Sequence, residues 1–318
     1  MIQETIILII SIAILARSSS AVIDSAAKLA NYFRVSQVAI GFILLAVATS
    51  LPELSVSIIS SVSGQGAISA GNVFGSNITN ILLILGLGAF IYKLKIHASS
   101  LKDIAIVLLL TTVISVYIVF NSYVQQKVLG LFEGIALLTI FGVYVWHTLK
   151  KKPVADGKEE KLVKKEEAFH AFIIFSIGVL FVMISSGFVV DSAVKLARIA
   201  GIAESFIGAT IIALGTSLPE LTIDLQAIRK KHYGLAIGDA IGSNMANLTL
   251  VLGTASVINP IEVQLPIFMV ALLFAVVANT LFFYVAAVNK GIKKLGGAVF
   301  ILIYLVYIAT IFFLQFGK

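Results

Sequence analysis

The sequence predicts an all-α integral membrane protein of about ten transmembrane helices, arranged as two inverted five-helix repeats with broken helices at the midplane. The first observation is composition: 59% of the 318 residues are hydrophobic and 12% are charged, whereas soluble domains are roughly 25% charged. The second is that apolar runs recur at lengths near the ~20 residues that a spanning helix needs. These runs are continuously apolar, unlike the alternating strands of a membrane barrel. The third is an internal repeat.

The apolar runs define the expected spans in chain order. They are 4–27, 36–62, 67–92, 103–121, 126–148, 168–193, 203–228, 234–258, 262–288 and 295–316. The first run resembles a signal peptide because small residues follow it, but a signal peptide carries positive charge before its apolar segment. Only Glu4 precedes this one. We therefore expect it to be the first helix of the mature protein.

The strongly polar segment KKKPVADGKEEKLVKKEE divides the chain into a first repeat (1–149), a linker (150–167) and a second repeat (168–318). Of the 23 Lys and Arg residues, 18 fall on the linker's side of the expected spans, 4 fall on the other side, and Arg17 lies inside the first span. Positive charge accumulates in cytoplasmic loops. The linker is therefore expected in the cytoplasm and both termini outside. The net charge of +7 then reflects membrane topology, and no nucleic-acid partner is expected.

The two halves repeat each other with a constant offset. TSLPEL occurs at 49–54 and 216–221, and GNVFGSN at 71–77 matches GDAIGSN at 238–244. The same offset separates Asp24 from Asp191, Glu53 from Glu220 and Asn80 from Asn247, since 191 − 24, 220 − 53 and 247 − 80 all equal 167. Because five spans, an odd number, precede the second copy, the copies insert with opposite orientation. Inverted repeats of this kind place a substrate site at their interface near the bilayer midplane.

Each repeat contains an apolar span interrupted by Thr-Ser-Leu-Pro-Glu. Proline removes a backbone donor and clashes with a preceding carbonyl, so carbonyls around 46–49 and 213–216 can be freed to bind cations. Glu53 and Glu220 follow these breaks directly. A carboxylate at membrane depth costs at least ~2.5 kcal/mol. Two carboxylates at equivalent positions therefore indicate function.

The next span of each repeat carries Gly-Ser-Asn and a second Asn three residues later. Asn80 and Asn247 are expected to line the site, whereas Asn77 and Asn244 are left open between ligands and packing, as are the glycines and serines. Carboxylate, amide, hydroxyl and backbone oxygens form a hard site that suits Ca²⁺ or Na⁺ rather than zinc or copper. One divalent ion, two monovalent ions or two protons would neutralise the two glutamates. Competition between these alternative sets of ions for the same two carboxylates produces antiport.

These paired segments resemble the α-repeats of the sodium/calcium exchanger family, of prokaryotic type, within the cation/calcium antiporter superfamily. The resemblance implies ten helices, a first and a sixth helix that slide across an eight-helix core, and exchange of Na⁺ for Ca²⁺ as substrates without a cofactor. The implied ion ligands are Glu53, Glu220, Thr49, Ser50, Ser76, Asn80, Thr216, Ser217, Ser243 and Asn247, with the carbonyls of Ala46 and Ala213. The amide at 247 resembles potassium-independent exchangers. The Gly-Asn-x-x-Glu setting of proton-coupled relatives is absent, which favours sodium coupling.

The sequence leaves three alternative functions to sodium/calcium exchange. An H⁺/Ca²⁺ antiporter would use the same carboxylates, and a cation channel would need a ring of charges around an open pore. An intramembrane hydrolase is disfavoured because His-Glu-x-x-His is absent and Asp239 has no partner aspartate in a matching motif, so no enzyme activity is expected. The lipid bilayer is the expected surrounding, and no obligate protein partner is evident.

Other charged residues receive structural interpretations. Asp24 and Asp191 each precede a lysine by four residues and are expected to form local helix pairs. Arg17 and Asp224 break the repeat symmetry because their counterparts are Ile184 and Ser57. A pairing of Arg17 with Asp224 is left open.

Overall fold

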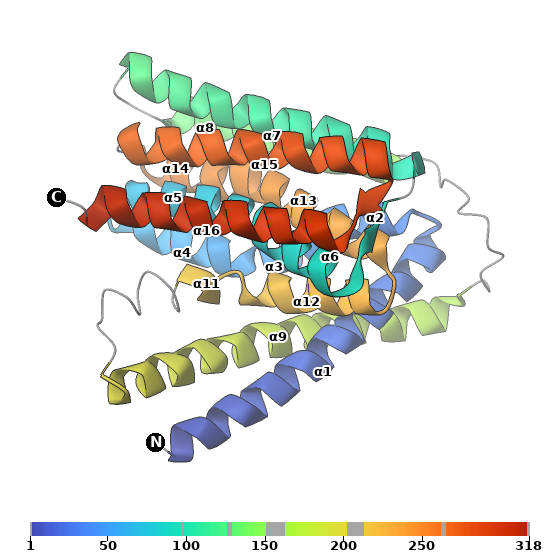
Figure 1. Cartoon of the computed structure of the whole chain (residues 1–318). Coiled ribbons are helices and arrows are strands. Elements are labelled where there is room, and N and C mark those ends of the chain that lie inside the picture. The colour runs from blue at the N-terminus through green and yellow to red at the C-terminus, as the bar shows by residue number, and fades with distance from the viewer. Residues whose placement is uncertain are drawn as a thin grey trace.

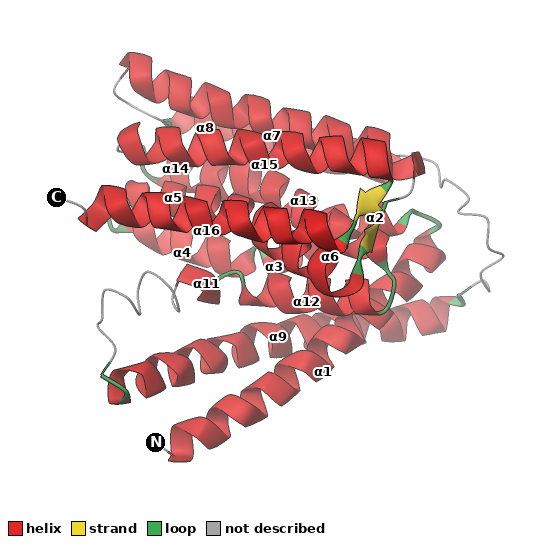
Figure 2. Cartoon of the chain, in the orientation of Figure 1, coloured by secondary structure: helices red, strands yellow, loops and turns green. Residues whose placement is uncertain are grey.

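The computed structural model describes residues 2–96, 98–125, 129–150, 163–201, 213–261 and 265–316. Nearly all of these residues are helical, and one short antiparallel strand pair is the exception (Figure 2). The continuous apolar runs produce this result because a helix satisfies every backbone polar group internally, as lipid requires. The predicted all-helical membrane fold is confirmed.

The first half comprises long single helices and two interrupted ones. Its elements are α1 (Ile2–Phe33), α2 (Gln37–Ile40), η1 (Gly41–Leu45), α3 (Ala46–Thr49), α4 (Leu51–Val62), α5 (Gly66–Ile78), η2 (Thr79–Leu85), α6 (Gly86–Tyr92), β1 (Leu94–Lys95), α7 (Ala98–Gln125) and α8 (Leu131–Lys150). The η segments are π-helical turns within longer helices. Such wide turns are often found at functional sites.

The second half follows the same order. Its elements are α9 (Lys165–Ile199), α11 (Ala213–Gly215), α12 (Leu218–Arg229), α13 (Tyr233–Ala246), η4 (Asn247–Val251), α14 (Leu252–Ile258), α15 (Leu265–Asn289), β2 (Gly291–Ile292) and α16 (Lys294–Phe316). Among the described residues, eight helices are long and apolar enough to span a membrane, and a bent helix pair makes a ninth. The remaining expected span, 203–228, is described only from Ala213 onward.

Equivalent residues of the two repeats take part in contacts between the halves. Leu94 in β1 pairs with Ile292 in β2, and Ile261, the counterpart of Leu94 in the second repeat (261 − 94 = 167), pairs with Leu129. The side chain of Asn279 donates to its own counterpart, Thr112 (279 − 112 = 167), over 2.8 Å between α15 and α7. Equivalent residues of the two repeats therefore meet across a pseudo-two-fold relationship.

The centre of the molecule depends on glycine contacts between the second span and α13. A Cβ atom on Gly41 would lie 2.6 Å from the carbonyl oxygen of Leu235, and one on Gly242 would lie 2.6 Å from the Cα of Phe42. Small residues at these positions let the two backbones touch. Every residue from Leu235 to Ala246 is buried. This close crossing brings the end of α3 against α13.

Helices α1 and α9 form a separate pair along one side of the bundle (Figure 1). They pack mainly against each other, and a Cβ on Gly178 of α9 would lie 2.8 Å from Val22 of α1. Helix α12 is the main element of the bundle that contacts α1. The pair thus lies directly over the part of the chain that contains Glu220.

Candidate cation site

Both Thr-Ser-Leu-Pro-Glu segments interrupt their helices, the first at Ser50 and the second at Thr216 and Ser217. Ser50 separates α3 from α4 with φ −78° and ψ 3°, and Ser217 precedes α12 with φ −91° and ψ 11°. The proline then lies in the first turn of the new helix, where its missing N–H has no intrahelical acceptor to lose. The two parts of the second span meet at 44°. The sequence prediction of broken helices is confirmed at these two positions.

The two glutamates lie in the first turns of α4 and α12. Glu53 is 0% exposed and Glu220 is 1% exposed. The partial positive charge at a helix N-terminus favours a carboxylate there. Glu53 Oε1 accepts from Ser76 over 3.3 Å, while the Oε2 atoms of both glutamates are buried with no donor among the described residues. Each repeat therefore contributes one carboxylate oxygen that lacks a partner.

Hydroxyl groups connect the broken helices to the neighbouring spans. Thr49 shares a hydrogen bond of 3.2 Å with Ser243 of α13, and its hydroxyl is a near neighbour of the Glu220 carboxyl group. Ser217 donates to Ser76 of α5 over 3.5 Å. The hydroxyl of Ser50 is buried without a partner among the described residues. Oxygens from four elements thus converge around the two carboxylates.

Four asparagines form a symmetric network at the start of the π-helical turns. Asn77 and Asn244 each donate to the other's backbone carbonyl, over 3.2 and 3.0 Å. Asn80 donates to Oδ1 of Asn244, and Asn247 donates to Oδ1 of Asn77, both over 3.1 Å. Within the described chain, the Oδ1 atoms of Asn80 and Asn247 have no partner. The Asn77–Asn244 pair therefore orients the other two amides so that each leaves one carbonyl oxygen available.

The remaining predicted ligands are placed less completely. The Ala46 carbonyl accepts from the Ser50 N–H over 3.1 Å and from the Thr49 hydroxyl over 3.4 Å, so the break does not free it in this conformation. A hydroxyl can rotate away, whereas the backbone bond persists. Thr216 is partly buried beside the second break. Ala213 begins α11, and its side chain lies outside the described part of the structure.

Asp239 borders this centre and was not among the site residues predicted from the sequence. Its Oδ1 accepts from Thr49 over 3.1 Å and from Ser243 over 3.4 Å, and the residue is 0% exposed. One signal was available: its counterpart in the first repeat is Asn72 (239 − 72 = 167), which carries no charge. Asn72 donates to the backbone carbonyl of Glu53 over 3.3 Å.

The structure corrects the pairing expected for Asp24 and answers the open question about Arg17 and Asp224. Asp191 pairs with Lys195 over 2.7 Å as expected, but Asp24 pairs with Lys230 over 2.6 Å instead of with Lys28. The expected pairing was based on residues of a single helix, whereas the loop after α12 places Lys230 beside Asp24. Arg17 is exposed on α1, whereas Asp224 is 0% exposed. They do not form an ion pair.

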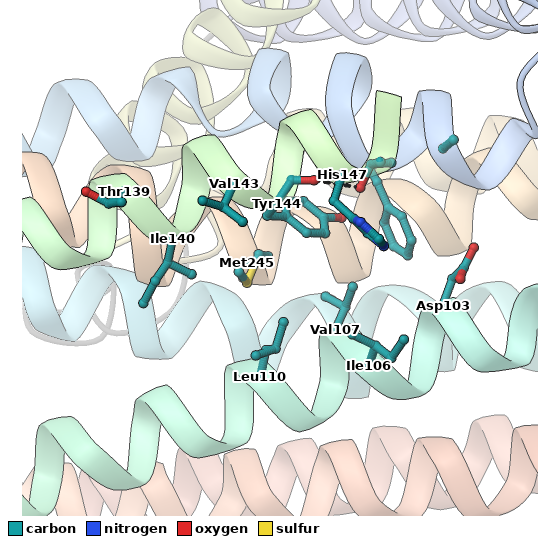
Figure 3. Close-up of a pocket in the computed structure, with 13 residues that line it drawn as sticks. Asp103, Ile106, Val107, Leu110, Thr139, Ile140, Val143, Tyr144, His147 and Met245 are labelled. Carbon is teal, nitrogen blue, oxygen red and sulfur yellow. Dashed lines mark hydrogen bonds between the residues drawn. The ribbon is translucent and has the colours of Figure 1, made fainter. Parts of the chain in front are cut away.

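A cavity of about 300 Å³ lies elsewhere, between α7, α8 and the start of the second span. Figure 3 shows apolar side chains such as Val107, Leu110 and Val143 along it, with Asp103 and His147 toward one end. None of the predicted ion ligands lines this cavity. An apolar lining supplies no oxygen cage, so the cation chemistry belongs to the buried glutamate centre.

The central oxygens have the character expected for hard cations. Two carboxylates, two amide oxygens and several hydroxyls converge without imidazole or thiolate, a combination that suits Ca²⁺ and Na⁺. Within the described ranges, no three His, Cys, Asp or Glu side chains cluster closely enough to hold a metal by themselves. Neutral oxygens must therefore supply much of any coordination.

Comparison with known proteins leads to the same chemistry. The family model described as sodium/calcium exchanger protein matches residues 4–150 and 170–313. Uncharacterized membrane protein MJ0091 of Methanocaldococcus jannaschii is 31% identical, over 89% of this chain and 90% of its own length. Sodium/calcium exchanger MaX1 of Methanosarcina acetivorans is 26% identical, over 97% of this chain and 98% of its own.

A solved structure of the sodium-calcium exchanger NCX_Mj, soaked with 10 mM Na⁺ and no Ca²⁺, superposes with a TM-score of 0.83. The sequences are 28% identical, and the match covers 97% of this chain and 99% of that one. The family expected from the repeat motifs is confirmed. With a family match across both repeats and a relative that is 31% identical over 89% of the chain, the chain belongs to the sodium/calcium exchanger family.

Proposed function

We propose that the protein exchanges Na⁺ for Ca²⁺ across a membrane by alternating access to the centre between Glu53 and Glu220. The observation that carries this proposal is the pair of buried carboxylates, each with an Oε2 atom that lacks a donor in the described chain. Two such charges at membrane depth require cationic compensation. Ca²⁺ or two Na⁺ provide it equally, so the two loads compete for one site.

The proposed ligands divide into charged and neutral groups. Glu53 and Glu220 neutralise the ion, while Asn80 and Asn247 add their unpartnered Oδ1 atoms. The neutral hydroxyl ligands are Thr49, Ser50, Ser76, Thr216, Ser217 and Ser243. Ca²⁺ takes about 6–8 oxygens, a number that this set can supply without water. The carbonyls of Ala46 and Ala213 are proposed as Na⁺ ligands, and the Ala46 carbonyl must then release the Thr49 hydroxyl.

Alternating access is proposed to arise from sliding of the α1 and α9 pair. These helices contact each other more than they contact the bundle, and they reach the site region chiefly through α12. Movement of the pair over α12 would change which end of the Glu220 region is covered. The Asp24–Lys230 ion pair, which joins α1 to the loop after α12, would have to break or follow that movement.

The proposed organisation keeps the boundaries given by the repeat: 1–149, a linker at 150–167, and 168–318. The distribution of basic residues supports a cytoplasmic linker with both termini outside. In the structure α8 ends at Lys150 and α9 begins at Lys165, which agrees with a linker of about this extent. The proposed location is a cell membrane, with Ca²⁺ and Na⁺ as substrates.

Reconstitution into liposomes tests the proposed function. Vesicles loaded with Na⁺ and diluted into Na⁺-free medium should take up ⁴⁵Ca²⁺, and dissipation of the Na⁺ gradient should stop uptake. A pH gradient of similar size, with Na⁺ absent, should drive little uptake. Uptake driven by the pH gradient alone would instead establish proton coupling, and uptake without any counter-gradient requirement would indicate a channel.

A further inference from the structure

The two repeats differ in charge at two positions beside the central site. Asp224 and Asp239 of the second repeat occupy the positions of Ser57 and Asn72 in the first, since 224 − 57 and 239 − 72 both equal 167. The first repeat is therefore neutral where the second has two carboxyl groups. The central site already has two equivalent glutamates, so it does not require these two additional carboxyl groups.

The two aspartates face each other between α12 and α13. Their carboxyl groups lie within hydrogen-bonding reach of each other, and both residues are 0% exposed. Both oxygens of Asp224 and the Oδ2 of Asp239 lack a donor in the described chain. Since carboxylate oxygens are only acceptors, a positive particle has to lie between them.

The described chain supplies no basic side chain for this pair. Lys230 binds Asp24, Lys195 binds Asp191 and approaches Glu4, and Arg17 is exposed on α1. A buried charge without a partner is strongly destabilising. Asp239 Oδ1 also accepts two hydroxyl hydrogen bonds, from Thr49 and Ser243, which is the arrangement of an ionised carboxylate.

We propose that Asp224 and Asp239 bind one monovalent metal cation of the sodium class, at a site additional to the central one. The three carboxylate oxygens of this pair that lack a donor, with the hydroxyl oxygens of Thr49 and Ser243, are fewer than the about 6–8 ligands that Ca²⁺ takes. A monovalent ion is therefore the better match in coordination, and one of the two carboxyl groups then keeps a proton so that the pair is neutral.

The position of the pair indicates what this ion does. Asp224 is one helical turn beyond Glu220, and Asp239 is one turn before Ser243, so both lie toward the basic loop at 229–231. The Thr49 hydroxyl donates a hydrogen bond to Asp239 over 3.1 Å and is a near neighbour of the Glu220 carboxyl group. An ion bound to this pair lies on one access side of the central site. Thr49 links the two sites through its hydrogen bond to Asp239. The symmetry-related position in the first repeat has no such site.

The test is equilibrium binding of ²²Na⁺ to the purified full-length chain in detergent, without Ca²⁺ and at constant pH and ionic strength. The variant is Asp224→Ser with Asp239→Asn, which introduces the residues that the first repeat itself has. We expect it to bind one Na⁺ fewer per chain at saturation. The matched control, Asp24→Asn with Asp191→Asn, removes two carboxylates that are each 56% exposed and should keep the wild-type number.

Retained ⁴⁵Ca²⁺ binding by the double variant shows that it is folded. If Ca²⁺ binding is lost, Asp224→Ser alone decides, because Asp224 hydrogen-bonds to none of the proposed central ligands in the described chain. Equal Na⁺ numbers in wild type and a folded variant overturn the proposal. So does a variant that differs from wild type only in protons released on loading, which would assign a proton to the pair. If the double variant binds one Na⁺ fewer but the wild-type protein does not exchange Ca²⁺, the proposed function is refuted and this site still stands.

Discussion

Replacement of Asn77 by Ala tests how the amide network prepares the site. Asn77 Oδ1 accepts the amide of Asn247 over 3.1 Å, which fixes which end of that amide faces the centre. Without it, Asn247 can turn its NH₂ group, a donor, toward the cation. The orienting bond has a net value of about 0.5–1.5 kcal/mol, so we expect Ca²⁺ affinity to fall about 2- to 12-fold.

The pseudo-symmetry supplies a second arm to this experiment. Asn244→Ala removes the equivalent acceptor for Asn80 and should weaken Ca²⁺ binding to a similar extent. Asn259→Ala is the control, since its amide donates to the Ser61 carbonyl over 3.2 Å, outside the network. Isothermal titration of purified variants with Ca²⁺ gives the affinities.

A double-mutant cycle then separates orientation from general damage. Asn77→Ala and Asn247→Ala act through one hydrogen bond, so their losses should be less than additive. Additive losses, or unchanged affinity in both Asn77→Ala and Asn244→Ala while the proteins stay folded, would refute the view that the first asparagine of each pair orients the second.

Three further predictions concern charge and topology. Glu53→Gln and Glu220→Gln should each abolish ⁴⁵Ca²⁺ exchange while leaving the fold intact, because one carboxylate remains to balance a divalent ion; robust transport by both variants would remove the site assignment. Asn247→Asp should retain exchange but make its rate depend more steeply on pH between 6 and 9, because like charges and poor solvation let the added carboxyl take up a proton; superimposable pH profiles would place position 247 outside the site. A cysteine at Gly157 should resist an impermeant thiol reagent in intact cells, whereas ready labelling from outside would reverse the proposed topology.

The large features of this fold follow from local sequence patterns. Apolar length specifies a spanning helix, proline specifies where a helix breaks, and the constant offset between the repeats identifies Glu53 and Glu220 as equivalent positions. These signals need no knowledge of distant contacts. They account for the family, the helical architecture and the burial of both glutamates.

Features that depend on contacts between distant segments were not predictable in this way. Lys230, which is 206 residues from Asp24, forms the ion pair that was expected for Lys28. No sequence pattern near Asp24 indicates this pairing. The exchange of hydrogen bonds among the four asparagines requires knowing that α5 and α13 meet at their ends. Asp239 was not predicted because the repeats were searched for identical residues, whereas Asp239 differs in charge from Asn72, its counterpart in the first repeat.

Na⁺ and Ca²⁺ are proposed to compete for one site that both glutamates form. The most direct test of this proposal is displacement of ⁴⁵Ca²⁺ from the purified protein by increasing Na⁺. We expect saturating Na⁺ to remove all bound ⁴⁵Ca²⁺ and higher Ca²⁺ to overcome the displacement. Glu53→Gln and Glu220→Gln should each abolish the same bound fraction. A fraction of ⁴⁵Ca²⁺ that remains bound at saturating Na⁺ and survives both substitutions would contradict this proposal.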